Sequence, residues 1–325
     1  MIIILLLFVS GSYLSSEVLR TEKADIREQY PERTMEILVG YGAGGGTDLS
    51  ARNMVQALTQ EGVIDQSFFV ENKVGAGGAL AIRQLAESDE HTLAAVPEFG
   101  DVLWNGTAGV ELSELTPIAQ VAQDYHLIAV HKDSPYETIE QLLDALKENP
   151  ESHVVSVGGT IVGMEAWGWQ EIFDDYGIDG QVRMLPLEGS NAALTNVLAG
   201  DAHATFVVPQ LAQPHIDEGN IRPLAVLTDE RTEQFPELPT LREKGLDVTY
   251  YRPRGFWING DAPDYYVEFW EEALEEMVET ETWQTYVEQS GLLPEFQNQE
   301  EYREQIIADG ESYQQFYEKI QEEIS

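Results

Sequence analysis

Apolar residues follow two alternating patterns along most of this chain. Short apolar runs, typical of buried strands, alternate with longer segments in which apolar residues return every three or four positions, as on one face of a helix. A strand–helix–strand–helix–strand order of this kind predicts a parallel sheet with both faces covered. The expected strands are 36–41, 67–71, 92–96, 118–123, 126–130, 154–157, 182–185, 204–208 and 224–227, and the expected helices are 49–60, 79–88, 138–149, 165–176 and 191–199.

The pattern restarts near the middle of the chain, with a glycine loop after a strand in each half. These loops are 40–46 and 158–163. A chain of 325 residues suffices for two domains, so two similar α/β lobes are the simplest interpretation. From Asp264 the chain is rich in acidic residues and carries an apolar stripe at helical spacing, which predicts core-facing helices. The stripe comprises Tyr266, Phe269, Trp270, Leu274 and Met277.

The first glycine loop has the features of an anion site. It follows the apolar strand and leads through Thr47 and Asp48, two residue types that favour helix N-caps, into a helical pattern. Glycines let backbone N–H groups converge on a ligand, and a helix N-terminus adds partial positive charge. Asp48 is expected to cap this helix or, alternatively, to contact the ligand.

The same loop leaves a nucleotide-binding alternative open. Residues 40–45 match the Gly-x-Gly-x-x-Gly dinucleotide fingerprint, and Glu71 ends the next strand, where a ribose-binding acid belongs. Against this, the glycines continue to Gly46, and a second glycine turn at 75–78 follows the candidate acid. A Walker loop is excluded because no Gly-Lys-Ser/Thr sequence follows. An NAD(P)-dependent Rossmann oxidoreductase is therefore retained as an alternative.

The charge balance narrows the possible partners. The chain has 58 acidic residues against 18 lysines and arginines, for a formal net charge of −40 at pH 7. Nucleic acids and anionic lipid surfaces would be repelled, so no nucleic-acid partner is expected. A strongly acidic surface is typical of proteins that stay soluble in concentrated salt, which favours a halophilic source. Any anionic ligand would have to be held by local backbone dipoles.

Motifs that carry chemistry are sparse, although the abundant carboxylates leave paired-acid catalysis open. The absence of cysteine excludes disulfides, thiolate catalysis and zinc–thiolate sites. None of the six histidines pairs with another at metal-ligand spacing on a helix face, and no Gly-x-Ser-x-Gly elbow is present. No metal is expected. Trp167 and Trp169 follow the second glycine loop, and their spacing places one in the core and the other toward a cleft.

The N-terminus predicts export. Residues 2–9 are continuously apolar but too few to span a bilayer, as in the hydrophobic region of a signal peptide. A bacterial lipobox would carry its lipidated cysteine at position 12, where this chain has Ser12, so a thioether lipid anchor cannot form on this sequence. We expect a signal-like segment at 1–12 and a polar tether at 13–33.

Four segments carry motifs in a fixed order. Residues 41–48, Tyr-Gly-Ala-Gly-Gly-Gly-Thr-Asp, resemble the motif Pro-Phe-x-x-Gly-Gly-x-x-Asp, and residues 70–78, Val-Glu-Asn-Lys-Val-Gly-Ala-Gly-Gly, resemble Val-Glu-Asn-x-x-Gly-Ala-Gly-Gly. Residues 219–226 and 238–245 resemble two later signatures of the same set. By these motifs the chain resembles the substrate-binding proteins of the tripartite tricarboxylate transporter family, the Bug or TctC family, from about Pro31 to its end.

The resemblance implies an α/β, two-lobed periplasmic-binding-protein fold of type II, a Venus flytrap, in which each lobe is a mixed sheet flanked by helices. Lobe 1 would comprise 34–130 and 250–325, and lobe 2 would comprise 131–249. Such a protein is exported, is not an enzyme and needs no cofactor. As a monomer, it delivers a small carboxylate, such as a di- or tricarboxylate, to membrane permease subunits. A ligand-sensing module of a receptor kinase would share the fold and site. The implied ligand-binding residues are Tyr41, Gly42, Ala43, Gly44, Gly45, Thr47, Asp48, Ala76, Gly77, Gly78, Gly158, Gly159, Thr160, Val162, Gly163, Met164 and Trp167.

Three departures from the family pattern bear on the ligand. Tyr41 stands where phenylalanine is usual, Trp167 where many members have histidine, and Glu188 where lysine is usual. One larger aromatic side chain and one positive charge fewer near the cleft predict a ligand that is smaller or less charged than citrate.

Overall fold

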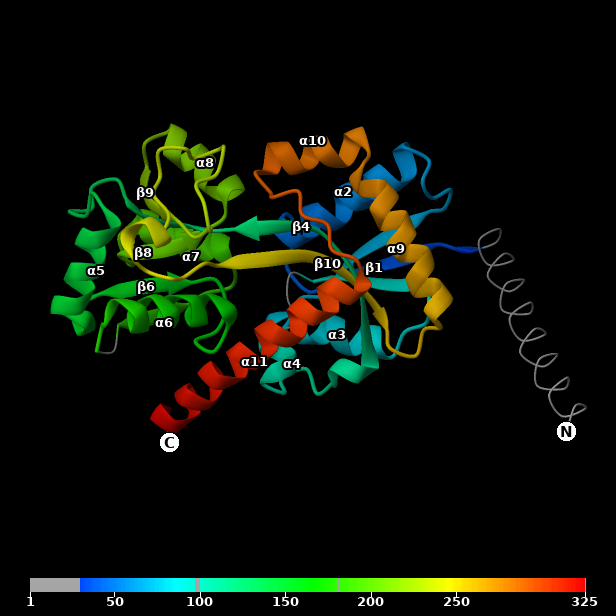
Figure 1. Ribbon diagram of the computed structural model, residues 1–325, viewed down its shortest axis with the longest axis horizontal. Coiled ribbons are helices and arrows are strands. Elements are labelled where there is room, and N and C mark those ends of the chain that lie inside the picture. Colours follow the sequence, from blue (N-terminus) through cyan, green and yellow to red (C-terminus); the bar gives the residue numbers. More distant parts are fainter. Residues whose placement is uncertain (1–29, 97–99, 180–181, 325) are drawn as a thin grey trace, which may run out of the picture.

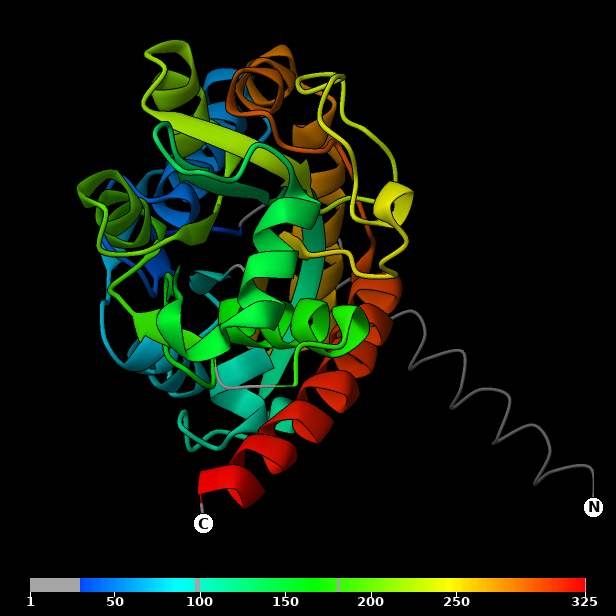
Figure 2. The ribbon, with the colours of Figure 1, turned by 90° about the vertical axis from the view of Figure 1, so that its left-hand side faces the viewer.

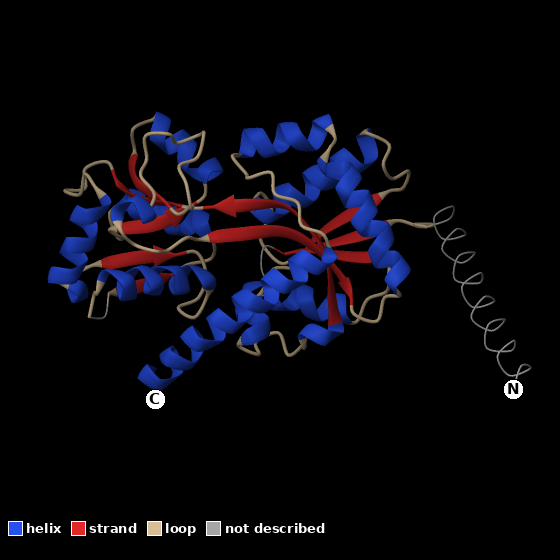
Figure 3. Ribbon diagram, viewed as in Figure 1, coloured by secondary structure: helices blue, strands red, loops and turns tan. Residues whose placement is uncertain are grey.

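Two five-stranded sheets lie side by side in the computed structural model (Figure 1), which describes residues 30–96, 100–179 and 182–324. The predicted signal-like segment, Ser12 and the tether up to residue 29 lie outside the described residues. Helices flank both sheets, as Figure 3 shows by colour, and the predicted pair of mixed α/β lobes is confirmed.

The first sheet has the order β2-β1-β3-β10-β4. The strands β1, β2 and β3 are parallel, whereas β10 is antiparallel to both of its neighbours. The expectation of a purely parallel sheet is therefore correct only for the first three strands. The elements of this lobe are β1 (Met35–Val39), α2 (Gly46–Gln60), β2 (Phe68–Asn72), α3 (Ala79–Ala86), β3 (Thr92–Val96), α4 (Gly100–Trp104), β4 (Leu115–Tyr125), β10 (Tyr251–Asn259), α9 (Asp264–Val278) and α10 (Glu281–Ser290).

The second sheet has the order β7-β6-β8-β5-β9, with β5 antiparallel to both β8 and β9. Its elements are β5 (Leu127–His131), α5 (Ile139–Glu148), β6 (Val154–Val157), α6 (Met164–Tyr176), β7 (Arg183–Pro186), α7 (Ser190–Ala199), β8 (Ala204–Val207), α8 (Pro209–Asp217) and β9 (Ile221–Val226). Short 3₁₀ turns occur at Ala76–Gly78, Leu112–Glu114, Pro150–Ser152 and Arg242–Lys244.

Every predicted strand and helix is present, with ends displaced by a few residues, but the sequence pattern did not indicate β10. Pro253 and Gly255 interrupt its apolar run, and both residue types are disfavoured inside strands. Pro253 pairs with Gln123 of β4, beyond the part of β10 that pairs with β3. It thus lies where the strand has a neighbour on one side only, a position that proline tolerates.

The connection between the lobes brings corresponding sheet edges together. By the pairing pattern β4 runs parallel to β1, so it leaves the first sheet at the edge where β1 and β2 end. A single residue, His126, separates β4 from β5, which enters the second sheet at the edge where β6 and β8 end. The carboxyl edges of the two parallel strand sets therefore adjoin at His126, an arrangement in which α/β proteins bind ligands.

The last helix, α11 (Gln299–Ile324), belongs to both lobes. Tyr302 and Ile306 pack in the first lobe with Trp257, whereas Tyr313 and Phe316 pack in the core of the second lobe. Figures 1 and 2 show this helix along the outer side of the molecule. In α9 the predicted apolar stripe faces the first core as expected: Trp270, Leu274 and Met277 are buried, with Tyr266 and Phe269 packed against them.

Candidate functional site

The first glycine loop is shaped by Asp48 from inside the helix. The N-cap of α2 is Gly45, with φ −76° and ψ 166°, and no side chain caps it. The prediction of Asp48 as N-cap is therefore wrong, because α2 begins at Gly46, ahead of both Thr47 and Asp48. Asp48 instead lies in the first turn, where its carboxylate accepts the N–H of Gly44 at 2.8 Å. This bond folds the loop back onto the helix start.

Asp48 also joins the loop to the end of the neighbouring strand β2. Its oxygens accept Nε of Arg52 at 3.0 Å and Nδ2 of Asn72 at 2.9 Å, and the same amide donates to the carbonyl of Tyr41 at 3.0 Å. Burial by itself would raise the pKa of Asp48, but the hydrogen bonds from Arg52, Gly44 and Asn72 outweigh it and lower this pKa. Asp48 is thus a buried, ionised anchor of the loop.

The structure brings the second glycine turn of lobe 1 against the first loop. Tyr41 donates its hydroxyl to the carbonyl of Gly77 at 3.1 Å. A Cβ on Gly40 would lie 2.8 Å from the Cα of Gly78, so the two turns approach as closely as backbones allow. Of the predicted residues here, Tyr41, Gly45, Thr47, Asp48 and Gly78 are buried or half-buried, and the exposed ones are Gly42, Ala43, Gly44, Ala76 and Gly77.

The second glycine loop follows β6 and is closed by Glu165. The buried carboxylate of Glu165 accepts the N–H of Gly158 at 2.5 Å and the hydroxyl of Ser190 at 3.1 Å. The N–H of Gly163 donates to the carbonyl of Thr160 at 3.0 Å, and Met164 starts α6. The N–H of Gly158 therefore serves the loop itself, whereas Gly159 and Thr160 stay exposed and Val162, half-buried, accepts the hydroxyl of Tyr313.

The two tryptophans of α6 differ in burial. Trp169 is fully buried and stacks on Phe206 with ring centroids 4.6 Å apart. Trp167 is half-buried and packs at the margin of the same core. The core position of Trp169 is confirmed, and the role of Trp167 toward a ligand stays a prediction.

Two arginines on β10 lie behind the glycine loops, and the sequence pattern missed both. Arg254 donates to the hydroxyl of Thr47 at 2.9 Å and forms a buried ion pair with Asp124 of β4. A Cβ on Gly46 would lie 2.6 Å from Nη2 of Arg254, so the guanidinium lies directly against the loop. The signal available in the sequence was two arginines two positions apart in a chain with only 18 basic residues.

Arg252 makes the corresponding contact with the second lobe. Its Nη1 lies 3.9 Å from Oε1 of Glu165, the side chain that closes the second loop. His126, fully buried between the sheets, has Nε2 4.0 Å from the same oxygen. Burial and then the charge of Arg252 hold the pKa of His126 well below 6.5, so its ring is neutral. Arginine side chains thus lie near both loops, each beside a carboxylate, and the expectation that backbone dipoles hold an anionic ligand stays a prediction.

A groove of about 1070 Å³ lies elsewhere, between the 228–234 segment and the α10 region. It is lined by Val121, Tyr125, Tyr251 and Trp283 among others, and by none of the predicted site residues. Successive side chains of a strand point to opposite faces. Tyr125 and Tyr251 lie on the face of the crossing strands opposite Asp124 and Arg252, so this groove lies across those strands from the glycine loops.

Known proteins share this architecture. A model of the tripartite tricarboxylate transporter family receptor matches residues 50–321. The UPF0065 protein in the gbd 5′ region of Cupriavidus necator is 24% identical over 85% of this chain and 84% of its own length. Protein BugT of Bordetella pertussis is 28% identical over 67% of this chain and 68% of its own.

Solved structures agree in fold. A TctC solute-binding protein from Polaromonas has a TM-score of 0.70 at 24% identity, over 89% of this chain and 99% of its own. MatC of Rhodopseudomonas palustris with bound malate scores 0.77 at 20% identity, over 88% and 99%. The R. palustris protein Rpa4515 with adipate also scores 0.77 at 20% identity, over 88% and 96%.

Fold and paired glycine loops together define a two-lobed solute-binding protein. Within that class, the chain belongs to the tripartite tricarboxylate transporter receptor family, in which it serves as the solute-binding receptor. Across the described ranges, no helix has both the length and the apolar character that crossing a membrane requires.

Proposed function

We propose that this receptor binds a small carboxylate between its lobes, at the two glycine loops, and presents it to the membrane permease subunits of its transporter. The observation that carries the proposal is the meeting of two sheet edges at His126, each edge bearing a glycine loop with an arginine of β10 behind it. The malate and adipate complexes of MatC and Rpa4515 support a dicarboxylate as the ligand.

In this proposal the ligand carboxylate binds the N–H groups of the exposed residues Gly42 and Ala43 beside the N-terminus of α2, while the N–H of Gly44 stays bonded to Asp48. Arg254 does not add a free charge there, because Asp124 pairs with it; its role is to hold Thr47 and the helix start in place. The opposite end of the ligand contacts Gly159 and Thr160 of the second loop. Binding to both loops favours the closed arrangement of the lobes over the open one.

The ligand is proposed to be a mono- or dicarboxylate rather than citrate. Trp167 adds bulk beside the second loop, and Glu188, which is exposed, adds a negative charge to it. A third carboxylate would meet that charge without a compensating lysine. The receptor is further proposed to act as an exported monomer, with lobe limits near residues 130 and 250 and no catalytic step.

Thermal unfolding at molar salt with a panel of acetate, malate, adipate and citrate tests this function. A ligand at a hundredfold excess over its dissociation constant stabilises a protein by about 2.7 kcal/mol, so binding gives a clear upward shift in Tm. Malate or adipate should shift Tm more than citrate, and calorimetry should rank the affinities in the same order. Nicotinamide cofactors serve as the comparison, and a shift with them but with no carboxylate would overturn the proposal.

A further inference from the structure

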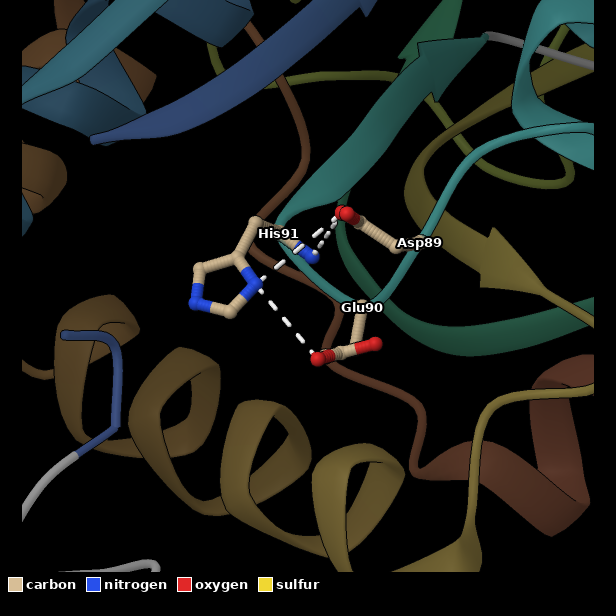
Figure 4. A group of neighbouring side chains, drawn as sticks. All are labelled: Asp89, Glu90 and His91. Carbon is tan, nitrogen blue, oxygen red and sulfur yellow. Dashed lines mark hydrogen bonds and ion pairs between the residues drawn. The ribbon is translucent and has the colours of Figure 1, made fainter. Parts of the chain in front are cut away.

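A turn at the far end of the first sheet gathers three groups that ligate metals. Asp89, Glu90 and His91 precede β3, so they lie at the edge of the sheet opposite the glycine loops. One ligand atom from each lies within 4.8 Å of the other two. Figure 4 shows the imidazole with one nitrogen directed at both carboxylates. We propose that this turn binds one divalent transition-metal ion, of the Zn²⁺ type, independently of the carboxylate site.

The burial and hydrogen bonding of His91 support a metal site more strongly than the two acidic residues do. The side chain is only 2% exposed, and its Nδ1 has no hydrogen-bond partner among the described residues. Its other nitrogen, Nε2, lies 3.0 Å from Oε2 of Glu32. When Nε2–H donates to that carboxylate, Nδ1 presents its lone pair to the two acids. A carboxylate on the far nitrogen is the usual outer partner of a metal-binding histidine, because it fixes the tautomer and ring orientation.

The distances from Nδ1 of His91 to the two carboxylates fit a shared metal ion better than a hydrogen bond. Nδ1 lies 3.6 Å from Oε1 of Glu90 and 3.9 Å from Oδ1 of Asp89. Both separations are too long for a hydrogen bond, so a proton on Nδ1 would still lack an acceptor. Tetrahedral ligands at about 2.0–2.2 Å from Zn²⁺ lie about 3.4 Å apart. Small torsions of the two partly exposed carboxylates close the difference.

The donor set selects the class of ion. One imidazole with two carboxylates suits Zn²⁺, Co²⁺ or Mn²⁺, whereas Ca²⁺ and Mg²⁺ prefer oxygen ligands alone. Two carboxylates balance the charge of a divalent ion, and three protein ligands leave a position for water. The expectation of no metal site was drawn from histidine spacing on helices, and a turn of consecutive residues escapes that rule.

The ion would join the start of the described chain to the first lobe. Tyr30 packs edge-on against His91 with ring centroids 5.1 Å apart and accepts Nε1 of Trp270 at 2.7 Å. Glu32 bonds His91, and Arg33 pairs with Asp89. A metal on His91 and Asp89 would therefore hold residues 30–33 against the body of lobe 1.

Titration of the chelator-treated full chain with Zn²⁺ and Co²⁺ at molar salt tests the site. We expect one equivalent to bind by calorimetry, and Co²⁺ to give a d–d absorption spectrum of nitrogen and oxygen ligands, because the chain has no cysteine. Glu90→Gln should weaken binding at least tenfold, and Glu32→Gln should weaken it roughly tenfold or more, as loss of an outer partner does. His91→Gln should abolish it.

Glu87→Gln is the matched control, since it removes the same charge from an exposed carboxylate at the C-cap of α3, in the same α3–β3 connection but outside the cluster. The affinity of Glu87→Gln for the metal ion should stay within about twofold of the wild-type affinity. In free energy that is far below the 1.4 kcal/mol of a tenfold change. Equal weakening by Glu87→Gln and Glu90→Gln would overturn the proposal, as would the absence of one-to-one binding. Circular dichroism and the carboxylate thermal shift report whether each variant is folded, so failure here is distinct from failure of the proposed function.

Discussion

At the scale of single residues, the most consequential feature is the buried charge beside the glycine loops. Arg254 of β10 forms an ion pair with Asp124 of the neighbouring strand β4. Arg252, also on β10, lies close to Glu165 of the second lobe. The sequence indicated Asp48 as a site residue because it follows a glycine run. It did not indicate Arg254 as a site residue, because Thr47, the hydrogen-bond partner of Arg254 in the first loop, lies 207 positions away in the chain.

Removal of Arg254 should be strongly destabilising. Arg254→Met leaves Asp124 buried without its partner, and loss of one member of a buried pair costs about 3–5 kcal/mol. The double variant Asp124→Leu with Arg254→Met removes both charges and should recover most of that loss. Denaturant unfolding at fixed molar salt measures both. A double variant less stable than Arg254→Met alone would contradict this account of the pair.

His126 should make the stability depend on pH. Its folded pKa lies well below 6.5 because of burial and Arg252, while the unfolded ring binds a proton near pH 6.5. Between pH 6.5 and 5 the unfolded state therefore binds more protons, and stability falls as pH falls, by up to ~1.4 kcal/mol per pH unit. Groups that face the ring are Arg252, Glu165 and Tyr250.

Unfolding free energies of His126→Gln, measured across this window, should show a shallower slope than the wild type. His131→Gln, which alters a partly exposed histidine of the adjoining strand, is the control and should keep the slope. An unchanged slope in His126→Gln would assign the pH dependence to other groups.

At the scale of elements, the loops were predictable and one strand was not. Glycine runs after apolar strands signal tight strand-to-helix turns by local chemistry alone, so both loops fall where the sequence places them. The strand β10 contradicts local propensity at Pro253 and Gly255, and only pairing with β3 and β4 holds it extended. The role of Glu165 in closing the second loop also depends on tertiary contacts, because the fold brings Ser190 of α7 to its carboxylate.

The second loop offers a matched pair of substitutions. A Cβ on Gly158 would lie 2.6 Å from the backbone nitrogen of Ser190 and 2.8 Å from the carbonyl carbon of Gly189, which cannot move without shifting α7. Gly158→Ala should therefore lower the free energy of unfolding by about 1–3 kcal/mol and weaken carboxylate binding. Gly159→Ala meets open space in the protein and should leave stability close to wild type. Denaturant unfolding measures the stability of both variants, and an equal loss in the two would contradict the role of this close approach.

At the scale of the whole molecule, net charge opposes the approach of the proposed carboxylate ligand. A formal charge of −40 repels a carboxylate at long range, whereas the loop N–H groups act only at contact. The Debye length falls from about 10 Å at 0.1 M salt to about 3 Å at 1 M, so salt removes the repulsion and spares the contacts.

Carboxylate association should therefore become faster as salt rises. The rate constant for malate, followed by stopped-flow tryptophan fluorescence, should increase several-fold between low and molar salt, with a smaller change in dissociation. The free energy of unfolding should rise over the same range, as a halophilic origin predicts. An association rate that falls with salt would mean that a local positive field dominates the approach of the ligand.

The sequence by itself determined the alternation of strands and helices, the two glycine loops, the core face of α9 and the acidic surface, because these depend on local periodicity, backbone freedom and composition. Only the tertiary structure decided which strands cross between the lobes, which arginine lies behind each loop, that α11 packs on both lobes, and that the turn before β3 presents His91 to two carboxylates. Apart from that turn of consecutive residues, those contacts join residues far apart in the chain, and the energies of all of them depend on burial and distance, which no local pattern encodes.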